Sequence, residues 1–90
     1  MSINLKEYEK ILKALANKRR LEILKYLKSE KKASVGDIAE KIDLSLKSTS
    51  RHLSVLLSIN LVENEQKGLS VFYYLTSKFP SIAKTIINDL

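Results

Sequence analysis

The sequence predicts a mostly helical domain with one small β-hairpin, its elements in the order α-α-α-α-β-β-α. Three observations predict this fold class. Apolar residues recur at helical spacing in five separate segments. Two short runs rich in Val, Phe and Tyr surround a glycine turn near position 68. The 90 residues contain only two glycines and one proline, so little of the chain is irregular. We expect one domain over residues 1–90.

The first helix is predicted over residues of about 4–16. The second is predicted from position 18 to the charged run at 29–32. Along the first helix, lysines and glutamates turn outward while apolar residues share one broad face. Asn17 is a residue type that caps helices, so the second helix begins after it. The apolar face of the first helix comprises Leu5, Tyr8, Ile11, Leu12, Leu15 and Ala16.

The third and fourth helices are predicted as a short and a longer helix joined by a tight turn. Ser34 and Asp37 have the spacing of a capping box, which starts a helix that runs to about Ile42. Residues 43–45 form the connection. Ser45 then caps a longer helix over residues of about 45–60.

The hairpin is predicted from strands at residues 61–65 and 70–75, with a turn at 66–69 in which Gly68 permits the tight bend. It forms a wing over residues of about 62–75. Pro80 then precedes a last helix over about 80–90. Its apolar stripe comprises Ile82, Ala83, Ile86, Ile87 and Leu90.

A short helix, a tight turn, a longer helix and a hairpin, in this order, are typical of a winged helix-turn-helix domain, whose second helix enters the major groove of DNA. At about 100° per residue the longer helix has two faces. The predicted core face holds Thr49, Leu53, Leu56, Leu57 and Asn60. The opposite face holds Lys47, Ser50, Arg51, Ser54 and Ser58.

The outward face suits a DNA duplex. Serine side chains are short enough to let the helix sink into the groove, and Arg51 can reach guanine O6 and N7 with its fork. The alternative is a solvated surface without a partner, which the surrounding topology disfavours. The predicted base-reading residues are Leu46, Lys47, Ser50, Arg51 and Ser54.

The net charge of +6 and the pI near 9.6 fit a protein that meets a polyanion. Three consecutive cations at the start of the second helix oppose its dipole, and phosphate would offset this cost. The alternative is that one of the three pairs with a carboxylate elsewhere in the fold. Lys67 beside Gly68 can touch a phosphate or the minor groove, although an ordinary polar turn also explains it. The predicted phosphate contacts are Lys18, Arg19, Arg20, Ser48, His52 and Lys67.

Five fragments in order and at matching spacing resemble the ArsR family of winged helix-turn-helix transcriptional regulators. They are Lys13-Ala14-Leu15-Ala16-Asn17, Arg20-Leu21-Glu22-Ile23-Leu24, Ser34-Val35-Gly36-Asp37-Ile38-Ala39, Ser48-Thr49-Ser50-Arg51-His52-Leu53 and Val71-Phe72-Tyr73-Tyr74-Leu75. The resemblance implies a homodimeric transcriptional repressor that binds double-stranded DNA and dimerises through its terminal helices. The expected interface comprises Leu5, Tyr8, Ile11, Leu12, Ile82, Ile86 and Leu90.

The chain departs from the family pattern at three places. Leu46 stands where the family commonly has a polar Gln, so it either packs inward or touches a thymine methyl group. Ser34-Val35-Gly36 stands where metal-responsive members carry Cys-Val-Cys. The last helix offers Asp89 and no histidine for a zinc-type site. We therefore expect no metal and no cofactor, and the sequence names no small-molecule effector.

Other classes of protein are less compatible with the sequence. The absence of cysteine excludes disulfides and favours the cytoplasm, and no segment has the pattern of a signal peptide or a membrane span. No acid–base pair, activated nucleophile or phosphate loop indicates an enzyme. Two alternatives remain: a winged helix for protein contacts in the transcription machinery, and an RNA-binding winged helix, which would stack bases on exposed aromatic residues.

Overall fold

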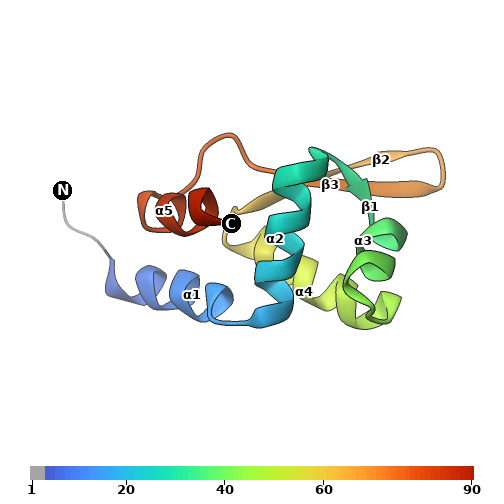
Figure 1. The fold of residues 1–90 in the computed structure, drawn as a ribbon. Coiled ribbons are helices and arrows are strands. Elements are labelled where there is room, and N and C mark those ends of the chain that lie inside the picture. The colour runs from blue at the N-terminus through green and yellow to red at the C-terminus, as the bar shows by residue number, and fades with distance from the viewer. Residues whose placement is uncertain (1–3) are drawn as a thin grey trace.

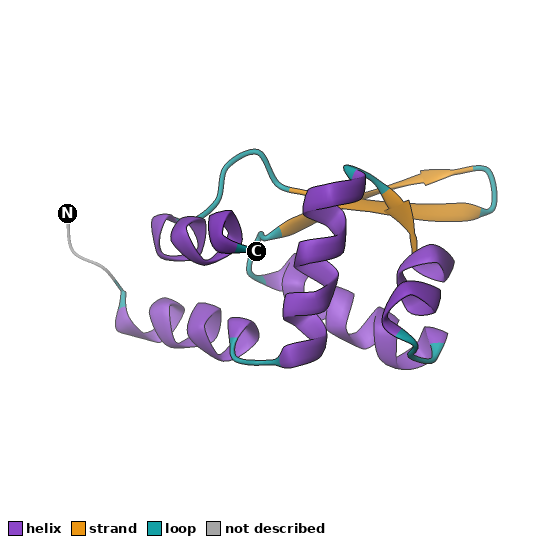
Figure 2. Cartoon of the chain, viewed as in Figure 1, coloured by secondary structure: helices purple, strands orange, loops and turns teal. Residues whose placement is uncertain are grey.

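The computed structural model describes residues 4–90 and has helices packed on a small sheet, with the hairpin projecting from one end (Figures 1 and 2). The predicted fold class is confirmed, with one additional short strand. The elements are α1 (Leu5–Leu15), α2 (Lys18–Glu30), β1 (Ala33–Ser34), α3 (Val35–Ile42), α4 (Leu46–Ser58), β2 (Val62–Lys67), β3 (Ser70–Leu75) and α5 (Ser81–Asp89).

The predicted helix starts are confirmed by their side-chain caps. The Asn17 side chain accepts a hydrogen bond from the backbone N–H of Arg20 at 3.1 Å. Ser34 Oγ accepts from Asp37 N at 3.1 Å, and Ser45 Oγ accepts from Ser48 N at the same distance. Each cap satisfies an amide that the helix itself leaves without a partner.

Helices α3 and α4 are each followed by a residue in the left-handed region, Asp43 with φ 54° and Asn60 with φ 59°. Asp and Asn tolerate this region better than most residues because their short polar side chains hydrogen-bond locally. The backbone N–H of Asp43 bonds back to Ala39 and Glu40, which ends α3 sharply. The placement of Asn60 on the core face is wrong: α4 ends at Ser58, and Asn60 is exposed in the following turn.

The sheet has three antiparallel strands in the order β1-β3-β2, one strand more than the sequence predicts. In β1, Ala33 pairs with Tyr73 and Ser34 with Phe72. The hairpin is also longer than expected, since β2 continues to Lys67, which pairs with Ser70. The turn therefore consists of two residues, Gly68 and Leu69, and Lys67 belongs to the strand.

The core is built around α2, which lies in front of α4 in Figure 1. Its inward side chains Ile23, Leu24 and Leu27 are almost completely buried. They belong to one hydrophobic cluster that also includes Ile38 of α3, Leu53 and Leu56 of α4, and Ile87 of α5. Burying side chains of this size stabilises the fold by about 1.5–3 kcal/mol each, so α2 is the element that joins the others.

Thr49 lies on the inner face of α4 and is completely buried, as the sequence predicts. Its hydroxyl is the single buried side-chain N or O atom of residues 4–90 without a hydrogen-bond partner. A buried polar group without a partner costs about 1–3 kcal/mol. The methyl group of Thr49 therefore contributes to the core, while its hydroxyl reduces stability.

We expect Thr49→Val to raise the free energy of unfolding by about 1 kcal/mol, because valine keeps the shape and removes the unpaired hydroxyl. Urea denaturation at one protein concentration measures the change. Ser54→Ala, which removes an exposed hydroxyl from the same helix, is the control and should change stability by no more than about 0.5 kcal/mol. A loss of stability in Thr49→Val would show that the hydroxyl has a partner in solution.

Candidate nucleic-acid interface

The helix-turn-helix unit consists of α3, the turn at residues 43–45 and α4. The inner side of α4 is anchored by Thr49, Leu53 and Leu56, all with no exposed surface. A helix has 3.6 residues per turn, so this burial also determines which side chains face solvent. The unit therefore presents one fixed face of α4.

The outward face of α4 is small, polar and basic. Lys47, Ser50, Arg51 and Ser54 are all exposed. Within residues 4–90, neither Lys47 nor Arg51 makes a side-chain hydrogen bond or an ion pair with the rest of the chain. Leu46 has 60% of its surface exposed at the start of this face, so it does not pack inward.

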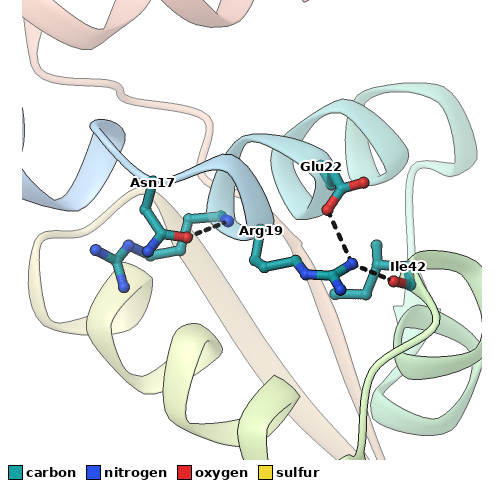
Figure 3. A network of polar contacts seen from close by, with 5 residues as sticks. Asn17, Arg19, Glu22 and Ile42 are labelled. Atoms are coloured by element: carbon teal, nitrogen blue, oxygen red, sulfur yellow. Dashed lines mark hydrogen bonds and ion pairs between the residues drawn. The ribbon is translucent and has the colours of Figure 1, made fainter.

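The three consecutive cations at the start of α2 lie in different environments. Lys18 is exposed. Arg19 is half-buried, and its Nη1 donates to the backbone carbonyl of Ile42 and to Glu22 Oε1, the latter at 3.3 Å (Figure 3). Since Ile42 is the last residue of α3, Arg19 joins α2 to the beginning of the turn that leads into α4.

Arg20 is also engaged within the chain. Its Nε donates to the Ala14 carbonyl at 2.6 Å, and its Nη2 donates to the Lys13 carbonyl at 3.3 Å. Its Nη1 lies 3.1 Å from Nδ1 of His52 on α4. Because a guanidinium only donates, Nδ1 accepts and the proton of the neutral imidazole is on Nε2. Arg20 thus connects the end of α1 to the side of α4.

The surroundings of His52 favour its neutral form. Partial burial lowers the pKa of its imidazole, and the nearby positive charges of Arg20 and Arg19 lower it further. Ser48, one turn earlier on α4, is half-buried. Both residues lie at the edge of the outward face, and their predicted contact with phosphate stays a prediction.

At the wing, Lys67 is exposed and its Nζ lies 4.0 Å from Glu65 Oε1. The same carboxylate accepts a hydrogen bond from Lys32, whose Nζ also lies 5.5 Å from the centroid of the Tyr74 ring. The hydrogen bond from Lys32 lowers the pKa of Glu65 more than partial burial raises it. Two lysines therefore neutralise this carboxylate near the hairpin tip. No local pattern in the sequence indicates Lys32 as its partner, because the two residues are 33 positions apart.

The predicted interface residues of the terminal helices lie in three different environments. Leu5 and Leu12 are exposed and Tyr8 is half-buried; they line a shallow hollow of about 450 Å³ along α1. Ile11, Ile86 and Leu90 pack partly against the chain's own core. Ile82 lies in a second hollow between α1 and α5. The outer face of α1 is therefore the larger apolar surface left uncovered.

Comparison with known proteins agrees with this geometry. A family model described as a helix-turn-helix domain matches residues 15–65. The arsenical resistance operon repressor of Bacillus subtilis is 38% identical over 74 residues, which cover 82% of this chain and 70% of that protein. The chain belongs to the ArsR family. The resemblance found in the sequence is confirmed.

Two further relatives in the ArsR family are similar to this chain over most of its length. The transcriptional activator HlyU of Vibrio cholerae is 39% identical over 82 residues, covering 83% of this chain and 75% of that protein. The structure of reduced HlyU superposes with a TM-score of 0.80 at 36% identity, over 97% of this chain and 87% of that one. The structure of a homodimeric winged helix-turn-helix DNA-binding domain of Mycobacterium bovis superposes with a TM-score of 0.79 at 30% identity. The match covers 93% of this chain and 74% of that one.

This ArsR-family chain is a transcription regulator of the winged helix-turn-helix type and not an enzyme. Its sequence has no cysteine. Among residues 4–90, no group of three or more His, Cys, Asp or Glu residues is arranged to hold a metal ion. None of the helices in this part of the chain is long and apolar enough to cross a membrane.

We expect the free energy of unfolding to fall as the pH decreases below about 6.5, because His52 binds a proton more readily in the unfolded chain than beside Arg20 and Arg19. Above this pH the imidazole is neutral in both states and contributes no pH dependence. Urea titrations between pH 5 and 8 measure the effect, in a window above the titration of Glu65. His52→Asn keeps an acceptor for Arg20 and should flatten the curve, and an unchanged slope would contradict the assignment.

Lys18→Ala and Arg19→Ala should differ in the salt dependence of DNA binding. Removing a phosphate contact lowers the slope of log K against log salt by about 1, and we expect this only for Lys18→Ala. Arg19→Ala instead should lose about 1 kcal/mol of stability, because the Ile42 carbonyl loses its donor. A lower slope with unchanged stability in Arg19→Ala would show that Arg19 contacts phosphate as the sequence predicts.

Proposed function

We propose that two copies of this chain bind one double-stranded DNA operator in the cytoplasm and repress transcription, with α4 in the major groove. The observation that carries the proposal is the outward face of α4. Lys47 and Arg51 are exposed and have no hydrogen-bond or ion-pair partner among residues 4–90, on a helix whose opposite face is fixed in the core. Side chains held this way on a rigid helix are suited to base readout.

The dimensions and chemistry of this face fit a major groove about 12 Å wide. Ser50 and Ser54 are short, so the helix axis can approach the base edges. The Arg51 guanidinium can donate two parallel hydrogen bonds to a guanine. Leu46 adds an apolar surface at the start of the helix, where it can contact a thymine methyl group. The face therefore combines a donor fork, small polar groups and one apolar contact.

Phosphate contacts would surround this helix. Lys18 and Lys67 are exposed at the start of α2 and on the wing, and Ser48 lies at the edge of α4. The chain carries a net charge of +6, and two chains double it, which favours association with a polyanion. Of the predicted phosphate residues, Arg19, Arg20 and His52 already have partners within the chain, so we assign them to positioning α4.

The proposed dimer interface is the outer face of α1, with α5 beside it. Leu5 is 80% and Leu12 45% exposed, and Tyr8 lies between them along the same helix face. Covering these side chains removes apolar surface from water, which stabilises association. The homodimeric M. bovis relative supports this assembly. A two-fold dimer would place its two α4 helices on half-sites about one helical turn apart.

The two alternative partners are less well supported. For RNA, the aromatic residues of β3 would have to be free to stack on bases, but Tyr73 is buried and the ring of Tyr74 lies against Lys32. For a protein partner, the face of α4 would be apolar or acidic. It is instead polar and basic, apart from Leu46.

Selection of duplexes from a random-sequence pool by the full chain should enrich an imperfect palindrome. With the selected duplex, we expect Arg51→Ala to lose affinity by roughly tenfold to a hundredfold, since one bidentate contact gives about 1–3 kcal/mol of discrimination. Affinity for unrelated duplex should change much less. Fluorescence anisotropy across a salt series measures both.

Lys41→Ala is the matched control, because it removes one positive charge from α3 rather than from α4. It should leave the preference for the selected duplex intact. If wild-type protein enriches no sequence, or if Arg51→Ala keeps the full preference, base readout by α4 is excluded. A selected site without two-fold symmetry would exclude the dimeric arrangement.

A further inference from the structure

We propose that Leu69, at the tip of the hairpin, is a specificity-determining residue that lies in the DNA minor groove beside the site read by α4. There its apolar side chain disfavours G·C pairs and tolerates A·T pairs. The inference rests on the proposed DNA-binding function and extends it to base pairs that α4 does not reach.

Leu69 is the most exposed large hydrophobic residue in the described chain, at 102% of its reference surface. It therefore contributes no packing to the fold. Leu5 and Leu12 belong to the proposed dimer face, and Leu46 belongs to the face of α4. Leu69 lies apart from both, in a turn position that polar residues usually occupy. Its side chain can lose water only by contact with another molecule.

The backbone of the tip is hydrogen-bonded up to the turn, so contact with a partner would cost little backbone entropy. Strands β2 and β3 are paired in register up to Lys67 and Ser70, directly before and after the turn. Gly68 has a φ of 63° at the first turn position, as a type II′ turn requires. The Gln66 side-chain amide donates to the Gly68 carbonyl at 3.3 Å. Leu69 is thus held at a fixed place at the end of the hairpin.

The hairpin has the length and direction to reach the flanking groove. Six residues per strand at about 3.3 Å each extend about 20 Å. A minor groove lies half a helical turn, about 17 Å, from the centre of the major groove. Figure 1 shows the hairpin extending away from α1 and α5. In a dimer formed through the terminal helices, the two tips would therefore lie over the outer flanks of the operator.

The charges near the tip permit close approach to DNA. Residues 66–70 contain no acidic residue. Glu65, the nearest carboxylate, is neutralised by Lys32 and Lys67. Lys67 also lies two residues from Leu69, where it can contact a phosphate at the edge of the groove. The tip thus combines a cation for the backbone with an apolar group for the groove.

The base preference follows from the chemistry of the minor groove. A·T and T·A pairs present only acceptors there, while a G·C pair adds the exocyclic N2 amine of guanine. A leucine side chain cannot accept a hydrogen bond from this amine. Covering the amine with Leu69 would leave a desolvated donor without a partner, which is unfavourable. Inosine lacks the amine. An I·C pair therefore separates the effect of the minor-groove amine from effects that arise in the major groove.

The test uses fluorescein-labelled versions of the selected duplex that differ only in the outer flanks, which carry A·T, G·C or I·C pairs. We expect the full chain to bind the A·T and I·C duplexes about fivefold to tenfold more tightly than the G·C duplex. Leu69→Asn, whose side-chain oxygen can accept from the guanine amine, should lose this discrimination. Lys67→Ala is the control and should weaken binding to all three duplexes alike. Thermal unfolding of each variant verifies that it is folded.

Equal binding of wild-type protein to the three duplexes would overturn the proposal, as would full discrimination by Leu69→Asn. Either result is compatible with the proposed function as long as Arg51→Ala still loses its preference for the selected site. If no duplex sequence is preferred at all, the proposed function itself fails. A preference for A·T over both G·C and I·C would indicate groove shape rather than the amine, and would also overturn the role of Leu69.

Discussion

The packing of α4 against α2 is the constraint on which the functional surface depends. Leu53 and Leu56 of α4 and Ile23 and Leu24 of α2 have no exposed surface. Because the helical repeat fixes the angle between successive side chains, this packing leaves α4 no freedom to rotate about its axis. The orientation of Arg51 and Lys47 is thus set by the apolar residues on the other side of the helix. Sequence variation on the outward face can change the DNA site without changing the fold.

The two cationic residue types have different tasks in this molecule. Arg19 and Arg20 direct their guanidinium groups to backbone carbonyls and to His52, while most lysines extend into solvent. An arginine can satisfy several acceptors at once with its five donors, and Arg20 does so with Ala14, Lys13 and His52. The net charge therefore overstates the charge available for DNA. Arg51 differs from the other two arginines because it is exposed and makes no side-chain hydrogen bond or ion pair with residues 4–90.

The features predicted correctly from the sequence are local ones. Helix caps at Asn17, Ser34 and Ser45 depend on residues three positions apart, and the faces of α4 depend on a repeat within one helix. The features that the sequence did not reveal join distant segments. Strand β1 has only two residues and exists through its pairing with Tyr73 and Phe72. The partners of Arg19 and Arg20 lie up to 32 positions away, and no periodic pattern encodes them.

Strand β1 explains how the wing and the helix-turn-helix unit can act as one body. Ser34 pairs with Phe72 of β3 through its backbone, and its side chain caps α3 through Asp37. The same residue therefore belongs to the sheet and caps the first helix of the helix-turn-helix unit. Arg19 fixes the other end of α3 through the Ile42 carbonyl. Since both ends of α3 are held, a shift of the hairpin would have to move α3 and the turn into α4 with it. The α4 helix and the hairpin, which we propose face the DNA, are therefore coupled through α3, which lies outside both the proposed base-reading face and the proposed dimer interface.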